Sequence, residues 1–201
     1  MVPTLLDKIL ELMEVLLDQF KYKMKKKIIN ILNKRFNKPI TCLTAYSPSI
    51  AKILDGNVDL ILIGDSLGTT LYGMRNTRGV TLNMMKLHGL AVTKNINKSI
   101  TVIDMPYKTY SNKIQAKKNA ISLLNYTNAK MIKIEINEKN LPIAKYLAEK
   151  KINFVAHIGV TPQSFVDFKK IRAVGKKKIE SEKLINLALN AEKAGANMLL
   201  L

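Results

Sequence analysis

An α/β fold made of parallel βα units is predicted by three features of the 201-residue sequence. Short apolar runs alternate six times with segments of helical length, which is typical of a parallel sheet covered by helices. Several of the runs end on a carboxylate, and no Gly-rich dinucleotide-binding fingerprint follows the first run. We therefore expect a (β/α)8 TIM-type barrel of which this sequence holds about six βα units. A six-stranded open sheet is the alternative.

The individual elements follow from local patterns. Aliphatic and β-branched runs predict strands, which we place at residues 40–44, 60–63, 100–103, 131–135, 152–156 and 198–201. Helix-length segments lie between them, which we place at residues 49–54, 81–92, 113–125, 140–149 and 181–194. A long loop with three glycines is expected over 68–79, and Gly195 suits the position just after the last helix. The stretch 169–178 is basic and is expected to be irregular.

The first 23 residues differ from the rest of the chain. Apolar residues at helical spacing over 4–20 predict an amphipathic helix, and a lysine-rich run follows it at 21–27. The polar face of the helix is acidic, which favours packing on the protein or an extension outside the fold over a membrane-surface helix. We expect an N-terminal helical extension at 1–23 and a catalytic barrel domain at 24–201, with a short helical pattern at 25–33.

The composition limits the class of protein. Hydrophobic residues make up 47% and charged residues 24%, which is typical of a globular protein. No uninterrupted apolar run reaches the length of a membrane span, so no membrane partner is expected. The start of the chain lacks a secretory pattern, and Cys42 is the only cysteine, so we expect no internal disulfide and a cytoplasmic location.

The net charge of +18 has two interpretations. A basic surface can bind nucleic acid, but here nearly all the basic residues are lysine, whereas bidentate reading of bases favours arginine. No interleaving of aromatic and basic residues is typical of RNA binding either. We therefore take the lysines as general surface residues and do not expect nucleic acid as a partner. A non-catalytic, polyanion-binding protein remains the alternative from outside the enzymes.

Three carboxylates follow three of the predicted strands. Asp65, Asp104 and Glu135 each stand at a strand end, and the carboxyl ends of parallel strands meet at one face of a barrel. Carboxylate oxygens without clustered Cys or His suit Mg²⁺. A 2-oxo acid could chelate such an ion through its carboxylate and keto oxygens, which would acidify the neighbouring C–H. The pattern predicts a Mg²⁺ site that acts on an oxo acid.

Several motifs together resemble one enzyme family. They are Thr44-Ala45-Tyr46, Gly64-Asp65-Ser66-Leu67-Gly68, Asp104-Met105-Pro106, Lys133-Ile134-Glu135 and the run His157-Ile158-Gly159-Val160-Thr161-Pro162-Gln163-Ser164. In order and spacing they resemble the ketopantoate hydroxymethyltransferases over roughly residues 25–201. The resemblance implies a (β/α)8 barrel that transfers a hydroxymethyl group from 5,10-methylenetetrahydrofolate to 3-methyl-2-oxobutanoate. The product, 2-dehydropantoate, leads to pantothenate and coenzyme A.

The resemblance also implies roles for particular residues. Asp65 and Asp104 would hold Mg²⁺, and Glu135 would complete the metal shell. The oxo acid would contact Asp65, Ser66, Asp104 and Lys133, and His157 would line the same pocket. Lys133 lies inside an apolar strand two residues before Glu135, which favours an inward cation over a surface lysine. His88 is expected to be structural. The family also implies a homo-oligomer.

Two features depart from the family pattern. The general base of the family is a glutamate that would follow Leu201, so no catalytic base is expected within these 201 residues. Loss of such a base removes roughly a 10²–10⁴-fold rate factor. We expect a fragment, a truncated reading frame or one piece of a split enzyme, and inactivity on its own is one expected consequence. The segment 1–23 has no counterpart in the family.

Another enzyme class shares part of the pattern. Mg²⁺-dependent barrels of the phosphoenolpyruvate mutase and isocitrate lyase type also act on 2-oxo acids and are the alternative within enzymes. The run from His157 to Ser164 favours the hydroxymethyltransferases.

Overall fold

The computed structural model describes residues 28–31 and 38–201. The chain divides into two units, Met1–Thr41 and Cys42–Leu201. In the first unit residues 28–31 are helical, inside the helical pattern expected at 25–33. The expected helix at 4–20 and the expected boundary after residue 23 lie outside the described residues. Within the described ranges, no helix combines the length and the apolar character needed to cross a membrane.

The second unit is built on one parallel sheet of six strands. They are β1 (Cys42–Thr44), β2 (Leu60–Ile63), β3 (Ile100–Asp104), β4 (Met131–Glu135), β5 (Phe154–His157) and β6 (Met198–Leu200). Each strand pairs in parallel with the next strand in sequence, so the order is β1-β2-β3-β4-β5-β6. A doubly wound sheet reverses its order at a switch point, whereas a barrel wall does not. The strand order therefore confirms the predicted barrel-type α/β fold, with five βα units and a sixth strand.

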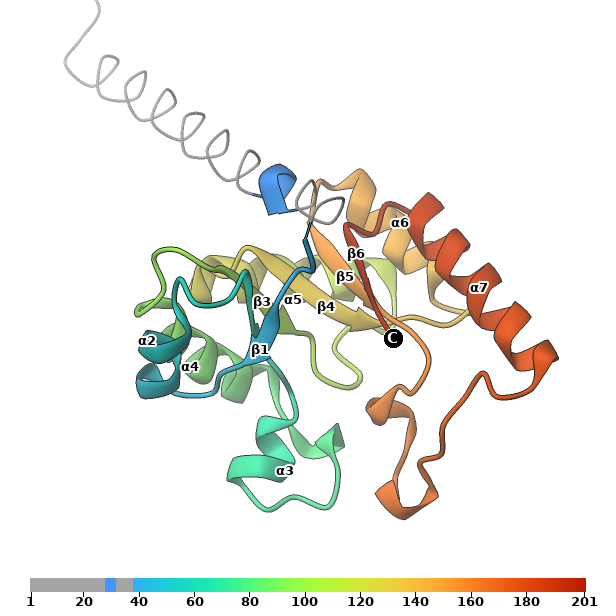
Figure 1. Cartoon of the computed structure of the whole chain (residues 1–201), viewed down its shortest axis with the longest axis horizontal. Coiled ribbons are helices and arrows are strands. Elements are labelled where there is room, and N and C mark those ends of the chain that lie inside the picture. The colour runs from blue at the N-terminus through green and yellow to red at the C-terminus, as the bar shows by residue number, and fades with distance from the viewer. Residues whose placement is uncertain (1–27, 32–37) are drawn as a thin grey trace, which may run out of the picture. The chain divides into compact units, whose positions relative to one another are not determined.

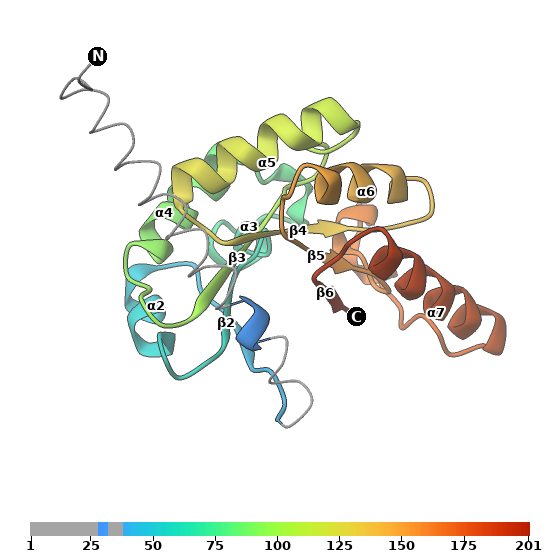
Figure 2. The same cartoon turned by 90° about the horizontal axis from the view of Figure 1, so that it is seen from above.

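Helices connect the strands and pack along the wall of the sheet. The main ones are α2 (Pro48–Leu54), α4 (Leu82–Thr93), α5 (Lys113–Thr127), α6 (Leu141–Glu149) and α7 (Lys178–Lys193). Neighbouring helices contact each other in the order α4–α5–α6–α7, and α4, α5 and α7 also contact the strands that follow them. Figures 1 and 2 show α5 and α6 on the same side of β3, β4 and β5.

Side-chain alternation in β4 separates the core from the site. Successive residues of a strand point to opposite faces. Ile132 and Ile134 belong to the apolar core, together with Leu123 of α5 and Leu147 of α6. Lys133 and Glu135 therefore share the face turned away from these helices, which is the interior of a barrel.

The structure corrects several expected boundaries. The expected loop at 68–79 contains a short helix, α3 (Leu67–Leu71), and the 3₁₀ turn η1 (Thr77–Gly79). A Cβ atom at Gly68 would lie 2.5 Å from Val80, so this glycine serves close packing rather than an open loop. The strand expected at 152–156 begins only at Phe154, because Ile152 N–H donates to Leu147 O at 3.0 Å and closes the end of α6.

Candidate active site

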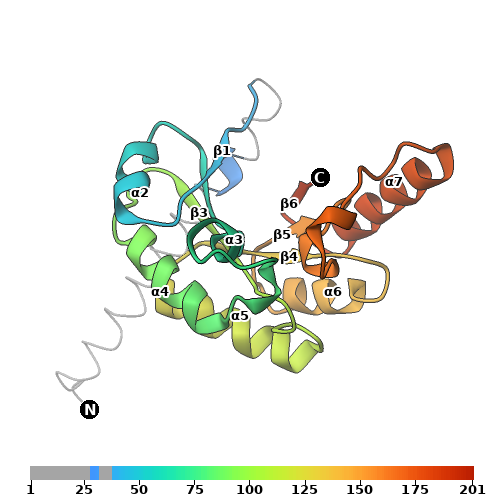
Figure 3. The same cartoon turned by 90° about the horizontal axis from the view of Figure 1, so that it is seen from below.

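The carboxyl ends of β2 to β5 bring together the polar residues that the sequence singled out. Two more 3₁₀ turns, η2 (Pro162–Ser164) and η3 (Phe168–Lys170), follow β5, and Figure 3 views the sheet from the end where α3 and this segment lie. Strand register aligns the site, because Asp104 of β3 is the partner of Lys133 of β4, and Glu135 of β4 is the partner of His157 of β5. The side chains that meet here are all buried: Asp65, Asp104, Lys133, Glu135, His157 and Gln163.

The turn after β2 places the first acid. Asp65 N–H donates to Asp104 Oδ2 at 2.9 Å, which joins the ends of β2 and β3. A Cβ atom at Gly64 would lie 2.8 Å from Ser66 Oγ, so a larger residue would force the hydroxyl to move. Ser66 Oγ lies 2.7 Å from Tyr46 Oη, at the end of β1. The Gly-Asp-Ser sequence thus holds a carboxylate and a hydroxyl side by side at the strand ends.

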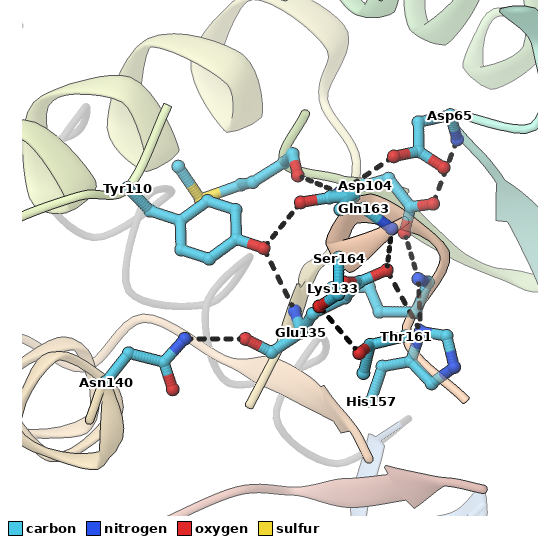
Figure 4. A network of polar contacts seen from close by, with 11 residues as sticks. Asp65, Asp104, Tyr110, Lys133, Glu135, Asn140, His157, Thr161, Gln163 and Ser164 are labelled. Carbon is cyan, nitrogen blue, oxygen red and sulfur yellow. Dashed lines mark hydrogen bonds and ion pairs between the residues drawn. The ribbon is translucent and has the colours of Figure 1, made fainter. Parts of the chain in front are cut away.

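A buried ion pair lies at the centre of the site. Lys133 Nζ is 2.9 Å from Asp104 Oδ1 (Figure 4). Burial disfavours the charged ammonium, but the negative charge and hydrogen bond of Asp104 outweigh it, with help from Asp65 and Glu135. The pKa of Lys133 is consequently held above its ordinary value. Lys133 therefore provides a fixed positive charge at neutral pH.

His157 is neutral beside this ammonium. Burial and the charge of Lys133 lower the pKa of His157 to about 4. Lys133 Nζ lies 3.3 Å from His157 Nδ1, and a neutral ring can accept this hydrogen bond. Glu135 Oε1 is 3.9 Å from the same nitrogen, which with a neutral imidazole is a polar contact rather than an ion pair.

Gln163 of η2 connects the carboxyl ends of β2, β3 and β4. Its Nε2 donates to Asp65 Oδ2 at 2.7 Å and to Met105 O at 3.0 Å. Its Oε1 accepts from Tyr110 Oη at 2.7 Å, and its backbone N–H donates to Glu135 Oε1 at 3.0 Å. Figure 4 shows the amide side chain of Gln163 in the middle of this network. One residue after β5 thereby fixes carboxylates that follow β2 and end β4.

Two carboxylates of the network titrate near neutrality. Burial, reinforced by the nearby charge of Asp104, raises the pKa of Asp65 to about 7. Burial also raises the pKa of Glu135 to about 7, against the hydrogen bond from Gln163 and the charge of Lys133. Buried carboxylates with raised pKa values are typical of sites that gain a cation or transfer a proton.

The donor set suits a metal that keeps water or substrate oxygens in its shell. No three acidic, His or Cys side chains within 28–31 and 38–201 form a ready-made metal cage. Asp104 Oδ1 is nevertheless buried, and the contact that it makes within the described residues is the ion pair with Lys133 Nζ at 2.9 Å. Mg²⁺ usually binds one or two carboxylates and completes its octahedron with water and substrate. Asp65 and Asp104 therefore fit such an ion.

A pocket adjoins the network. It has a volume of about 430 Å³, and Glu135 and Gln163 line part of it. Tyr107 and Tyr110 provide aromatic surface, and Arg78 contributes a guanidinium group. Pockets of this size commonly hold small molecules. The site thus consists of a buried acid–lysine cluster and a more open chamber beside it.

Sequence reasoning missed Gln163 and Tyr110 as site residues. Tyr110 Oη donates to Gln163 and accepts from Glu135 N–H at 3.3 Å. Gln163 stood inside the motif that begins at His157, and Tyr110 follows Asp104 by six residues, so both lay near recognised signals. His88 lies apart from the cluster on α4, where its ring nitrogens contact Tyr46 O at 2.8 Å and Tyr72 Oη at 2.9 Å.

The six-stranded parallel sheet with its helices is similar in fold to solved enzyme structures. Phosphonopyruvate hydrolase in complex with oxalate and Mg²⁺ matches with a TM-score of 0.66 and 10% identity, over 88% of this chain and 62% of that one. 2,3-Dimethylmalate lyase, described as a phosphoenolpyruvate mutase/isocitrate lyase superfamily member, matches with a TM-score of 0.63 and 12% identity, over 89% and 60%. At such identities the likeness shows the fold alone.

The sequence places the chain within a particular family. Residues 25–201 match the ketopantoate hydroxymethyltransferase family, and the chain belongs to it. The 3-methyl-2-oxobutanoate hydroxymethyltransferase of Pelagibacter ubique is 43% identical over 78% of this chain and 61% of its own length. The enzyme of the same name from Rhizobium rhizogenes is 39% identical over 81% and 60%. The chain thus spans about six tenths of the length of these relatives.

Proposed function

We propose that this chain carries the metal and oxo-acid subsite of a 3-methyl-2-oxobutanoate hydroxymethyltransferase. The net reaction joins the one-carbon unit of 5,10-methylenetetrahydrofolate to C3 of the oxo acid. A C–C bond replaces the C3–H bond, water supplies the new hydroxyl, and tetrahydrofolate leaves. The observation that carries the proposal is the buried cluster of Asp65, Asp104 and Lys133, which combines two metal-type carboxylates with a fixed cation.

Asp65 and Asp104 are the proposed holders of Mg²⁺, with Glu135 completing the shell. A bound Mg²⁺ would polarise the keto group of the substrate and make the adjacent C–H more acidic. The hydrogen bond from Asp65 N–H to Asp104 Oδ2 at 2.9 Å keeps the two strand ends together, so Asp65 and Asp104 are neighbours before the ion binds. Glu135 is tied to η2 through Gln163 N–H, which limits its movement.

Lys133 is proposed to bind the carboxylate of the oxo acid. Its ammonium is protonated and buried. The neighbouring His157 is neutral and therefore does not balance this positive charge. An anionic substrate would add a charge-assisted hydrogen bond to a cation that is already in position. Ser66 provides a hydroxyl at the same end of the sheet, and His157 closes the side of the site next to Lys133.

Binding rather than turnover is the direct test. None of the residues assigned above is proposed to abstract the proton from C3, so binding can be tested without turnover. Titration calorimetry of 3-methyl-2-oxobutanoate into the 201-residue chain should show binding with Mg²⁺ and none with EDTA. Absence of Mg²⁺-dependent binding by folded protein would refute the proposal.

A pair of variants separates the site from general charge effects. Asp104→Asn should weaken Mg²⁺-dependent binding by more than about tenfold, because a metal carboxylate is lost. Glu149→Gln removes an acid from the exposed end of α6 and should leave binding unchanged. Equal binding by the two variants would contradict the metal assignment. The homo-oligomer and the cytoplasmic location implied by the family remain predictions.

A further inference from the structure

The chamber beside the acid–lysine cluster carries an unbalanced positive charge. Among the described residues that line it, Arg78, Lys108 and Lys139 are cations and Glu135 is the single acid. Glu135 also belongs to the buried network, where its carboxylate already accepts from Gln163 N–H. The outer part of the chamber is therefore built to attract an anion, while its inner part meets the proposed metal and oxo-acid subsite.

Arg78 is held in place rather than free in solvent. Its guanidinium lies 4.0 Å over the ring of Tyr107 and donates a hydrogen bond to the Tyr107 hydroxyl. Its backbone N–H donates to Asn76 Oδ1 at 3.0 Å, and Asn76 Nδ2 donates to Val166 O at 2.7 Å, which ties η1 to the segment after β5. An arginine held by its aromatic face can still present N–H groups to a carboxylate in a bidentate fork.

Lys108 is held in a tight turn after β3, which Thr109 N–H closes by donating to Pro106 O at 3.1 Å. Its φ is +62°, in the left-handed region. The two other non-glycine residues with positive φ, Asn128 and Lys151, stand at the ends of α5 and α6, where this conformation is common. Lys108 is the third residue of the turn Pro106–Thr109, where a positive φ is also common. Its Nζ is 5.6 Å from the centre of the Tyr107 ring, so the same aromatic side chain has two cations near it.

We propose that this chamber binds the one-carbon donor, with Arg78, Lys108 and Lys139 holding the carboxylates of its glutamate tail. This inference rests on the proposed function, which requires a folate to bring its carbon to the oxo acid. The glutamate of a folate carries two carboxylates at neutral pH, and its aminobenzoyl ring matches the aromatic surface of Tyr107 and Tyr110. The arrangement puts the reactive end of the donor towards Glu135 and Gln163 and the anionic tail towards the cations.

The test compares two stable reduced folates that differ only in the tail. 5-Formyltetrahydrofolate and its des-glutamyl counterpart, capped as the N-methylamide so that it carries no carboxylate, are titrated into the full chain in the presence of Mg²⁺ and 3-methyl-2-oxobutanoate. Partly exposed ion pairs contribute about two- to fivefold each, so three cations should favour the glutamyl compound by roughly 10- to 100-fold. Raising the salt concentration should reduce that preference.

Charge-matched variants decide whether the three cations of the chamber cause the preference for the glutamyl compound. The triple variant Arg78→Gln, Lys108→Gln, Lys139→Gln should bind both folates equally. The control triple Lys52→Gln, Lys118→Gln, Lys145→Gln loses the same charge from lysines outside the chamber and should keep the full preference. Arg78→Lys retains the charge but not the fork, and should lose about threefold for the glutamyl compound only. It serves as the test if the triple variant does not fold.

The outcomes separate this inference from the proposed function. Equal affinities of the unaltered chain for the two folates, or an equal loss in both triple variants, overturn the assignment of the chamber. If Mg²⁺-dependent binding of the oxo acid persists in that case, the proposed function stands without it. If the oxo acid itself does not bind, the proposed function fails first.

Discussion

Replacement of Gln163 by leucine should destabilise the whole strand-end network. Leucine has a similar volume but removes the donors to Asp65 Oδ2 and Met105 O and the acceptor for Tyr110. A hydrogen bond to a charged group contributes about 1.5–3 kcal/mol, and a neutral one about 1 kcal/mol. Because Gln163 is 5% exposed, water cannot replace these partners. We expect the free energy of unfolding to fall by about 4 kcal/mol at pH 8, where Asp65 is ionised.

Urea unfolding followed by circular dichroism measures this loss. For a chain of this size, such a change should lower the melting temperature by roughly 8–16 °C. Ser164→Ala is the matched control, because Ser164 lies in the same turn and is exposed; its contact with Thr161 Oγ1 at 2.9 Å is a surface one. The control should stay within about 0.5 kcal/mol of the original protein. A loss below about 1 kcal/mol for Gln163→Leu would refute Gln163 as the residue that joins the strand ends.

Three further results are expected. Mg²⁺ should bind more tightly at pH 8 than at pH 6 and release protons on binding, because the pKa values of Asp65 and Glu135 lie at about 7 in the metal-free chain. Calorimetry in two buffers of different ionisation enthalpy measures the number of protons released. A Mg²⁺ affinity that does not change with pH would contradict the prediction. The ring of His157 should remain neutral down to about pH 5, since its pKa is lowered to about 4; ¹⁵N chemical shifts that titrate near pH 6.5 would show otherwise. Asp55→Ala should cost roughly 2–3 kcal/mol in urea unfolding, because the Asp55 carboxylate accepts three backbone N–H groups at 2.8–2.9 Å just before β3. Asp55→Asn should cost less, and equal losses would indicate that the charge of Asp55 adds nothing.

Local patterns were enough to predict most of the fold. The apolar runs at 60–63 and 131–135 became β2 and β4 with the expected bounds, since a buried parallel strand needs only a short stretch of apolar residues. The start of β5 and the turns inside 68–79 were missed. Their course depends on contacts such as Ile152 N–H to Leu147 O and Gly68 against Val80, which hydrophobic periodicity does not encode.

The sequence also determined which acids would meet, because the ends of parallel strands share one face whatever the details of packing. Asp65, Asp104 and Glu135 were placed together on that rule, and the motifs around them identified the family. Their partners were decided only by the tertiary structure. Gln163 reaches Asp65 across 98 residues of chain, and Asp104 pairs with Lys133 through strand register. The raised pKa values of the acids and the lowered pKa of His157 follow from burial, which exists only once the strands have assembled.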